Sequence, residues 1–457
     1  MQVFQDSSLV GSNKDINKCS HKICGHLFFF EVIMNMLKDI DSFVDNNRDK
    51  IIKFFADCIA IKSYTCQEKE MADFLLNFFK ENKMPAFRTK RGSVLSIVTP
   101  KKQELEKDFG NFDSPFEAIR HHILYLKENN IKILAYNAHM DVVGEGDSKL
   151  WTTDPFSLDI REGKIYGRGT CDMKCSLVAM AQSMIFANNS DLEIKNAVLG
   201  CFVTEEEAAE GLAFEEIIVE LGIEPDFVIL GEPTGNKISL GQRGKVKFTI
   251  EATGKRAHSS VPEKGINAVY PLSEDLLVID KFNQEEYRNF AEDVVKRNSV
   301  VVTKVITEPD DSSSVISFAK ADVIARLAKG ETFSSLIAKL SSYPTWKDLK
   351  YKVETYDKAS YTGIVKDWKT EHKAWLTDRY NSFVKKLADS IENVTCQKAD
   401  YTIWPFSTDG VLSASRCNIP TVGFGAGFES VCHIVDEYVD EKNFFDSLKV
   451  YTMLILG

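Results

Sequence analysis

The chain has 457 residues, of which 44% are hydrophobic and 27% are charged, and its formal net charge is −11. This length is too great for one compact core, so we expect two domains. The acidic balance argues against a nucleic-acid partner, which would require a basic face, and it is compatible with bound cations. No apolar run approaches the ~20 residues that a membrane span needs. We therefore expect a soluble protein without a membrane partner.

The ten cysteines are scattered along the chain and form no C-x-x-C pair. With no recognisable secretory signal, this pattern predicts reduced thiols and a cytoplasmic location. Cys171 and Cys175 lie four residues apart around Asp172. We interpret them as small buried residues rather than as soft metal ligands. A thiol-dependent enzyme that uses Cys171 is an alternative, and it predicts an activity that chelators do not affect.

The first 35 residues admit two interpretations. The apolar run 26–34 is interrupted by Glu31 and lacks the basic start and the small-residue cleavage site of a secretory signal. It is either a buried helix or strand edge, or part of an extension outside the fold, with Met34 or Met36 as the working start. Beyond it, the spacing of Phe, Leu and Ile predicts helices over 37–61 and 67–82, the second one capped by Thr65.

Apolar strands and amphipathic helices then alternate along the chain, which predicts an α/β sheet covered by helices on both faces. We expect strands over 94–98, 131–138, 197–203 and 226–230, and helices over 176–187 and 211–221. The charged segment 101–130 contains a helical run at 116–127. We interpret this run as a solvated surface helix.

Ligand-type side chains follow the predicted strands. His139 and Asp141 lie two residues apart after one buried run, so on an extended backbone they share a face and the carboxylate could hold the imidazole. Asp172 arrives after a glycine-flanked turn. The acidic run 204–207 and Glu232 each follow a strand, where ligands collect in α/β sheets. Histidine combined with carboxylates predicts a site for a cation such as zinc.

The pattern changes at about residue 241. We predict a small α+β insert over 242–360. Apolar and polar residues alternate over 245–251, extended segments follow at 300–305 and 314–327, and helices are expected at 268–279 and 332–340. The segments 382–392, 419–424 and 439–454 then complete the first domain. The expected organisation is an N-terminal extension at 1–35, a main domain formed by 36–241 and 361–457, and the insert.

Five ordered motifs carry a resemblance to a known family. They are A-Y-N-A-H-M-D-V-V with the later Y-G-R-G-T-C-D-M-K, T-E-E-E at 204–207, G-E-P-T at 231–234, A-H-S ending at 259, and C-H-I-V-D-E-Y at 432–438. From about residue 37 to its end, the chain resembles the dinuclear zinc amidohydrolases and peptidases of the M20 type, on the acetylornithine deacetylase and succinyl-diaminopimelate desuccinylase branch. S-Y-T-G and W-P-F-S-T-D-G look closest to a subgroup labelled selenium-metabolism hydrolases, a label that names no proven substrate.

This resemblance implies a zinc-exopeptidase-like mixed sheet flanked by helices, with the insert serving as a lid and dimerisation domain in a homodimer. It also implies two zinc ions, for which cobalt or manganese can substitute. Asp172 is expected to bridge the two ions. The complete set of implied metal ligands is His139, Asp172, Glu207, Glu232 and His433.

The resemblance assigns three further roles. Glu206 is the expected general base, Asp141 is expected to orient His139, and His258 resembles a lid histidine that donates to the developing oxyanion, often in the other subunit. Because all three acidic residues of the run are Glu, base and ligand in the alternative register would be Glu205 and Glu206. The V-D-E-Y after the C-terminal histidine resembles the start of a helix.

Two stretches bear on the substrate. Ser407 and Thr408 resemble the substrate-side loop of this group. Arg326, at the end of a lid strand, either pairs with a substrate carboxylate or is a surface or structural arginine. The expected reaction is hydrolysis of an amide bond in an N-acyl amino acid or a small peptide-like molecule. One alternative is a dipeptidase or carboxypeptidase on the same site. Another is a non-catalytic dimer that binds metal or an amino acid, although a binding module has no need of a general base.

Overall fold

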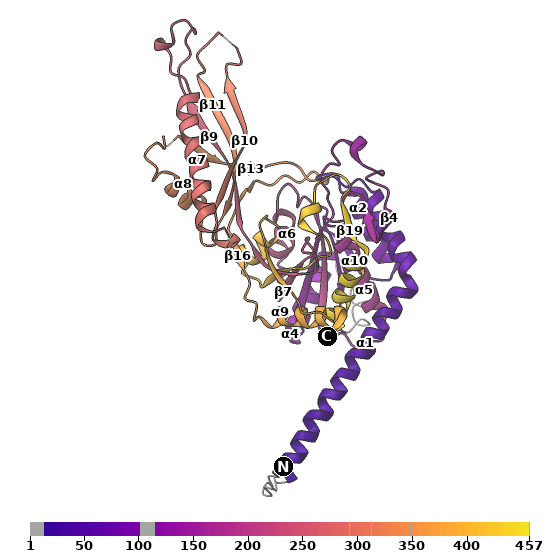
Figure 1. Cartoon of the computed structure of the whole chain (residues 1–457). Coiled ribbons are helices and arrows are strands. Elements are labelled where there is room, and N and C mark those ends of the chain that lie inside the picture. Colours follow the sequence, from indigo (N-terminus) through magenta and orange to yellow (C-terminus); the bar gives the residue numbers. More distant parts are fainter. Residues whose placement is uncertain (1–12, 101–114, 292, 312, 348, 457) are drawn as a thin grey trace. The chain divides into compact units, whose positions relative to one another are not determined.

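The computed structural model describes residues 13–100 and 115–456, apart from positions 292, 312 and 348, and it describes no side chains before residue 31 or at 115, 116 and 118. Figure 1 shows the elements coloured along the chain. The chain divides into two compact units, Met1–Arg48 and Asp49–Gly457, and we describe each by itself.

The described part of the first unit is the beginning of one long helix, α1 (Asn13–Ala60), which continues into the second unit. The predicted helix over 37–61 therefore ends where expected but begins much earlier, and the predicted boundary at 35 falls inside it. Whether residues 1–35 lie outside the working fold stays a prediction. In the part of the chain that the structure describes, no helix is both long enough and apolar enough to cross a membrane.

A mixed sheet forms the centre of the second unit. Nine strands follow the order β1-β2-β6-β3-β7-β18-β8-β16, with β17 beside β8. The four consecutive strands β6, β3, β7 and β18 are parallel to one another. Strand β2 is antiparallel to both β1 and β6, and β18 is antiparallel to β8. The strands are β1 (Ala86–Arg88), β2 (Val94–Val98), β3 (Ile133–His139), β6 (Ala197–Val203), β7 (Phe227–Leu230), β8 (Ile238–Gln242), β16 (Trp375–Leu376), β17 (Tyr401–Trp404) and β18 (Thr421–Gly423).

Helices cover both faces of this sheet, as the α/β pattern predicts. On one face, the Tyr136 hydroxyl of β3 donates to the backbone carbonyl of Tyr451 in α10. On the other face, α4 buries Ile119, Ile123 and Leu126 in a core shared with β2, β3 and β6. The helices are α2 (Lys69–Glu81), α4 (Pro115–Glu128), α5 (Lys174–Asn189), α6 (Leu212–Glu215, continued by a π turn at Glu216–Glu220), α9 (Ser382–Thr395) and α10 (Glu441–Leu456).

Two local predictions need correction. The helix expected at 116–127 exists as α4, but it is not a solvated surface helix, because apolar side chains spaced at about one turn bury one face of it; residues 101–114 of that segment lie outside the described residues. Thr65 does not cap α2, which begins at Lys69. Its hydroxyl donates instead to Asp141 Oδ2 at 2.8 Å.

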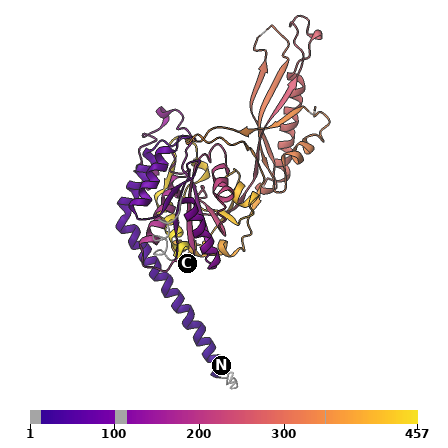
Figure 2. The same ribbon diagram turned by 180° about the vertical axis from the view of Figure 1, so that it is seen from behind.

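A second, smaller sheet has the order β10-β11-β9-β12, with β15 beside β9, and all its pairs are antiparallel. Helix α7 lies along this sheet in both views (Figures 1 and 2), and α8 begins after Thr332, which forms a capping box with Ser335. The elements are β9 (Gly244–Thr253), α7 (Val269–Asn289), β10 (Ser299–Glu308), β11 (Phe318–Leu327), α8 (Phe333–Leu340), β12 (Lys350–Val353) and β15 (Glu371–His372).

The small sheet reaches beyond the predicted boundary at 360. His372 of β15 pairs with Lys245 of β9, and the chain rejoins the large sheet only at β16. Strands of two residues carry no periodicity that a sequence pattern can report. The remaining pairs are β13 (Thr355–Tyr356) with β14 (Trp368–Lys369), and β19 (Tyr438–Asp440) with β5 (Lys164–Tyr166) and β4 (Asp159–Arg161). Short turns lie at Ser148–Leu150, Pro262–Lys264, Val294–Lys296, Val411–Arg416 and Glu429–Val431.

Candidate metal centre

Three neighbouring parallel strands end at the same edge of the large sheet. The register pairs His139, the last residue of β3, with Val203, the last residue of β6, and pairs Asn137 of β3 with Leu230 at the end of β7. The side chains that follow these ends therefore meet in space, as ligand-binding residues do in open α/β sheets. All seven residues of β3 are buried, as are all seven of β6. The edge is thus held by a rigid, apolar support.

A cluster of histidines and carboxylates forms at this edge. His139 Nε2 lies 3.0 Å from Asp172 Oδ1 and 3.9 Å from Glu232 Oε1. On the other side, His433 Nε2 lies 3.1 Å from both Asp172 Oδ2 and Glu207 Oε1. The structure thus brings all five predicted metal ligands together. All of them except His139 line a pocket of about 330 Å³.

The donor set fits divalent cations. His139, Glu206 and Glu232 present ligand atoms within 4.8 Å of one another, and so do His139, Asp172 and Glu207. The carbonyl of Asp141 lies 2.8 Å from His139 Nδ1, and a carbonyl can only accept, so Nδ1 carries a proton. The opposite ring nitrogen then faces carboxylates, which requires either a second proton or a cation.

The electrostatics of the cluster point the same way. Burial, and then Glu232, raise the pKa of Glu206 well above its ordinary value. Burial and Asp172 raise the pKa of Glu207 to about 7, and hydrogen bonds to Asp172 and Glu207 raise the pKa of His433 to about 10. In Asp172, burial favours the neutral acid, but the hydrogen bonds from the two histidines outweigh it and hold its pKa below the usual range. The site therefore needs positive charge to keep its carboxylates ionised.

The three glutamate side chains that follow β6 point in two directions. The Glu205 carboxylate, fully buried, accepts from Arg91 Nη2 at 2.7 Å and from the Tyr356 hydroxyl at 3.0 Å. Glu206 and Glu207 face the cluster instead. Glu205 has a φ of +60°, a left-handed conformation that reverses the chain between these directions. This arrangement agrees with the register that makes Glu206 the base and Glu207 a ligand, and it leaves Glu205 outside the cluster.

Asp141 acts differently from its predicted role. Its carboxylate lies 3.7 Å from His139 Nδ1, too far for a good hydrogen bond, and the ring is held by the Asp141 backbone carbonyl. The carboxylate instead accepts the backbone N–H groups of Glu206 and Glu207, at 3.1 and 3.2 Å. The i, i+2 spacing predicted a shared face. The backbone leaves the strand after His139, so the carboxylate turns toward the neighbouring loop.

The predicted substrate residues separate into two groups. Arg326 and Ser407 line the metal pocket, together with Lys245, Glu210 and other side chains. Burial lowers the pKa of Arg326, and its Nη1 has no hydrogen-bond partner within the described part of the chain. Thr408 is fully buried, and its hydroxyl donates to Gln242 Oε1 at 2.6 Å, so it does not line the pocket.

His258 is not brought to the cluster within one chain. It is exposed on the loop after β9, its Nδ1 lies 2.8 Å from Ser260 Oγ, and it is not among the residues that line the pocket. Its expected role in the other subunit stays a prediction. Cys171 and Cys175 are fully buried, as predicted.

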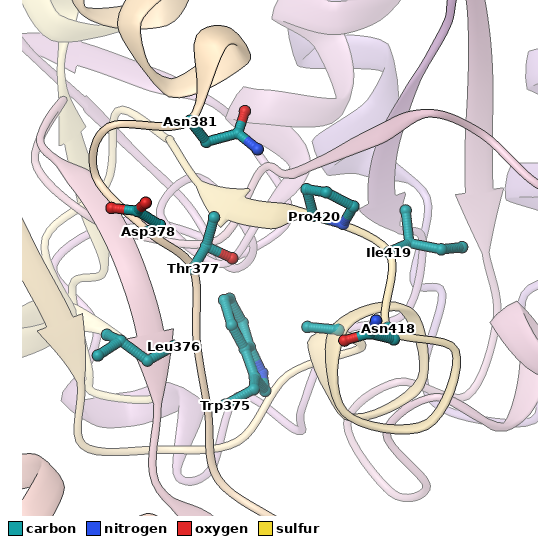
Figure 3. A pocket seen from close by; sticks show the side chains of 9 residues that line it. Trp375, Leu376, Thr377, Asp378, Asn381, Asn418, Ile419 and Pro420 are labelled. Atoms are coloured by element: carbon teal, nitrogen blue, oxygen red, sulfur yellow. The ribbon is translucent and has the colours of Figure 1, made fainter.

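A second cavity, of about 250 Å³, shares no residue with the metal pocket. Figure 3 shows Trp375, Thr377 and Asp378 on one side of it and Asn418 and Pro420 on the other. The Thr377 hydroxyl donates to the Thr421 carbonyl, so its hydrogen is already engaged by the protein itself. We assign no ligand to this cavity.

Sequence reasoning missed several buried carboxylates around the cluster. Glu437 was included in a predicted helix start, but α10 begins only at Glu441, and Glu437 contacts the turn that carries Asp172. Glu68 accepts the backbone N–H of Glu205, and Asp409 accepts from Asn137 and from the N–H of Gly211. The position of Asp409 beside Ser407 and Thr408 in the W-P-F-S-T-D-G motif is the one signal that could have identified it.

A sheet edge that gathers two histidines and several buried carboxylates beside one pocket defines a candidate metal centre. The chain belongs to peptidase family M20/M25/M40, whose family model matches residues 135–457, and it is a metal-dependent hydrolase.

Individual relatives agree with this placement. The Escherichia coli (strain K12) protein described as "Uncharacterized protein YgeY" is 25% identical over 430 residues, which cover 94% of this chain and 97% of the relative. A "Probable succinyl-diaminopimelate desuccinylase" of Staphylococcus epidermidis is 28% identical over 348 residues, covering 70% of this chain and 82% of the relative. Among solved structures, the M20 family metallo-carboxypeptidase Sso-CP2 from Sulfolobus solfataricus superposes with a TM-score of 0.67 at 16% identity, over 89% of this chain and 98% of that one.

Proposed function

We propose that the protein hydrolyses the amide bond of an N-acyl amino acid or a small peptide-like molecule with the help of two zinc ions. The placement of Asp172 carries the proposal, because one of its oxygens faces His139 and the other faces His433. A carboxylate with a histidine at each oxygen suits a pair of cations that share one ligand. His139 and Glu232 would complete one site, and Glu207 and His433 the other. Cobalt or manganese could substitute for zinc.

Glu206 is the proposed proton carrier. Two cations held by these residues would lower the pKa of a nearby water molecule and polarise the scissile carbonyl. Glu206 accepts the proton of the attacking water and later delivers it to the nitrogen of the leaving amine. Its Oε1 is buried and has no hydrogen-bond partner in the described residues, which supports this role, because a general base needs an acceptor free to meet its substrate. The Asp141 carboxylate fixes the backbone on which Glu206 stands.

Arg326 is the proposed contact for the carboxylate of the substrate. Lys245 lies directly opposite it on the neighbouring strand, but Lys245 is already paired with Glu210. Arg326 keeps an unpartnered, largely buried Nη1 at the pocket wall. An N-acyl amino acid places a carboxylate one carbon from its amide nitrogen, and so does a dipeptide at its C-terminus. Arg326 therefore suits both substrate types and rejects neutral amides.

The small domain is the proposed dimer contact. Among the described strands, β10 pairs only with β11, so one edge of the small sheet is unpaired. Four apolar side chains of this domain are each more than half exposed. They are Val301 and Val305 on β10, and Tyr270 and Leu277 on α7. An unpaired edge with exposed apolar side chains is a template for pairing with a second chain. In such a homodimer, His258 of one chain would donate to the oxyanion in the site of the other.

A substrate panel tests this function. The zinc-loaded protein is incubated with N-acetyl and N-succinyl amino acids and with dipeptides, and the release of primary amine is measured. We expect cleavage of at least one carboxylate-bearing amide, loss of cleavage with a chelator, and cleavage about 10²–10⁴-fold slower with Glu206→Gln. Cleavage of dipeptides alone would favour the dipeptidase or carboxypeptidase alternative. An activity that survives chelation would overturn the proposal.

A further inference from the structure

The turn that carries Asp172 is held by a single buried carboxylate. Glu437 Oε1 accepts the backbone N–H groups of Gly169, Cys171 and Asp172, at 3.0, 2.8 and 3.0 Å. The backbone carbonyl of Glu437 also accepts the N–H of Gly167, at 3.0 Å, and the hydroxyl of Thr170, at 3.2 Å. Glu437 is fully buried. One residue therefore accepts four of the six backbone N–H groups of the Gly167–Asp172 turn.

Arg168 completes this arrangement from within the turn. Its Nη1 donates to Glu437 Oε2, and its side chain is 2% exposed, so the two charges neutralise each other out of contact with solvent. Its Nη2 lies 3.3 Å from the carbonyls of both Gly144 and Ile434. Ile434 directly follows His433. The guanidinium thus ties the turn that carries Asp172 to the segment that carries His433.

The position of Glu437 in the chain links the turn that carries Asp172 to the segment that carries His433. Glu437 lies four residues after His433, in the short segment that leads into β19. Two ligands that are distant in sequence, Asp172 and His433, are therefore held by one loop and its hydrogen bonds. Without this support, Asp172 would stand on a glycine-flanked turn with little to restrict it, since Gly167 and Gly169 both have positive φ values.

We propose that Glu437, together with Arg168, is a positioning residue that holds Asp172 and His433 at the separation a pair of cations requires. This inference rests on the proposed two-metal function. Outer contacts of this kind orient metal ligands, and their removal typically costs about 10–100-fold in metal affinity. Glu437→Gln keeps the size of the side chain but offers a neutral acceptor to three N–H groups and turns an amide N–H₂ toward Arg168. We expect weaker zinc binding with the fold retained.

Glu286 offers a matched control. It is a buried glutamate of the small domain that also accepts a backbone N–H from a distant segment, that of Asn298 at 2.7 Å, as well as the Asn298 side chain at 3.1 Å. Glu286→Gln removes the same kind of charge from the same kind of contact, away from the metal cluster. It should lower the melting temperature without changing zinc affinity.

The test measures zinc binding to metal-free protein by competition with a chromophoric chelator, and amide hydrogen exchange over residues 167–173. For Glu437→Gln we expect zinc dissociation constants raised about 10–100-fold for at least one of the two ions, and faster exchange over the turn. Glu286→Gln should match the wild type in both. Arg168→Lys, which keeps the buried positive charge, serves if Glu437→Gln does not fold, and it should weaken zinc binding in the same direction.

Each outcome has one meaning. Zinc affinity and exchange within twofold of the wild type for the folded variants would overturn the positioning role. An equal loss of zinc affinity in Glu286→Gln would overturn it too, because the effect would then reflect general stability. If the wild type itself binds no zinc, the proposed function fails. The exchange rates of the metal-free protein then still report whether Glu437 holds the turn.

Discussion

Nε2 of His433 lies 3.1 Å from Oδ2 of Asp172, while the other oxygen of the same carboxylate faces His139. The two histidines therefore belong to different proposed sites, because His139 faces Glu232 and His433 faces Glu207. We expect His139→Ala and His433→Ala each to lose one of the two zinc ions and to retain about one, as measured by mass spectrometry of the purified variants. Full zinc content in either variant would contradict this division of ligands.

Glu206→Gln separates a base from a ligand. The Glu206 carboxylate also lies within ligand distance of His139 and Glu232, so the structure alone allows both roles. As a general base, its loss should reduce kcat by about 10²–10⁴-fold, the usual contribution of proton transfer, and leave two zinc ions per chain. Metal analysis and steady-state kinetics on the same sample decide the matter. Loss of one zinc ion in Glu206→Gln would make this residue a ligand.

Arg326→Ala should act on substrate binding. Removing a charge-assisted contact to a carboxylate costs about 1.5–3 kcal/mol, so we expect KM to rise about 10–100-fold. The effect on kcat should be small. Because the lost contact is to the carboxylate, the methyl ester of the same substrate should be cleaved equally well by wild type and variant. If the variant raises KM equally for acid and ester, Arg326 does not bind the carboxylate.

Two experiments test the proposed dimer, one on its contact at β10 and one on His258. Val301→Lys combined with Val305→Lys places charges on the unpaired edge of β10 and should yield monomers in analytical ultracentrifugation. Mixing two inactive variants, His258→Ala and Glu206→Gln, should restore activity, because each mixed dimer contains one site with both residues intact. If the mixture remains inactive although mixed dimers form, His258 does not act across subunits.

His372 predicts a pH dependence of stability. Its side chain is 2% exposed and its Nε2 has no partner among the described residues. Burial outweighs the opposing effect of Glu210 and lowers the pKa of His372 to about 4, against about 6.5 in an unfolded chain. Between these values the unfolded state binds more protons, so stability rises with pH through this window and is lost as pH falls.

We expect this group to remove about 1.5 kcal/mol of unfolding free energy between pH 6.5 and pH 5. Urea unfolding of the wild type and of His372→Gln at both pH values measures the difference. The variant should show a smaller loss on acidification. An identical loss in both proteins would mean that the pKa of His372 is the same in the folded and unfolded states.

The apolar elements of this fold were largely predictable from local pattern. Strands β2 and β6 have the predicted bounds, because fully buried strands appear as short, unbroken apolar runs. The helix predicted over 332–340 is α8, which the structure shows to begin after its cap Thr332. Residues 13–36 were not predicted as part of α1, because the run 26–34 left open a buried helix or strand edge and an extension outside the fold. The buried face of α4 escaped because the charged segment before it suggested a solvated helix.

In the candidate site, the metal ligands were predictable from the sequence, but the residues that hold them were not. Ligands that directly follow strand ends, such as His139 and Glu232, were predictable because the topology of an α/β sheet brings those ends together. The residues that hold these ligands in place were not predictable from local spacing. Glu437 and Arg168 form a long-range pair, and Asp141 turns to a neighbouring loop rather than to the histidine two residues before it. Such contacts depend on how distant loops meet, and no local spacing records them.

The most direct test of the account is zinc content in parallel with amide cleavage on one sample of purified protein, before and after chelation and after zinc is restored. The account predicts about two zinc ions per chain, loss of amide cleavage on chelation and recovery when zinc is returned. A protein that holds no metal and takes up none when zinc is added would contradict the assignment of His139, Asp172 and His433 as ligands, and with it the proposed reaction.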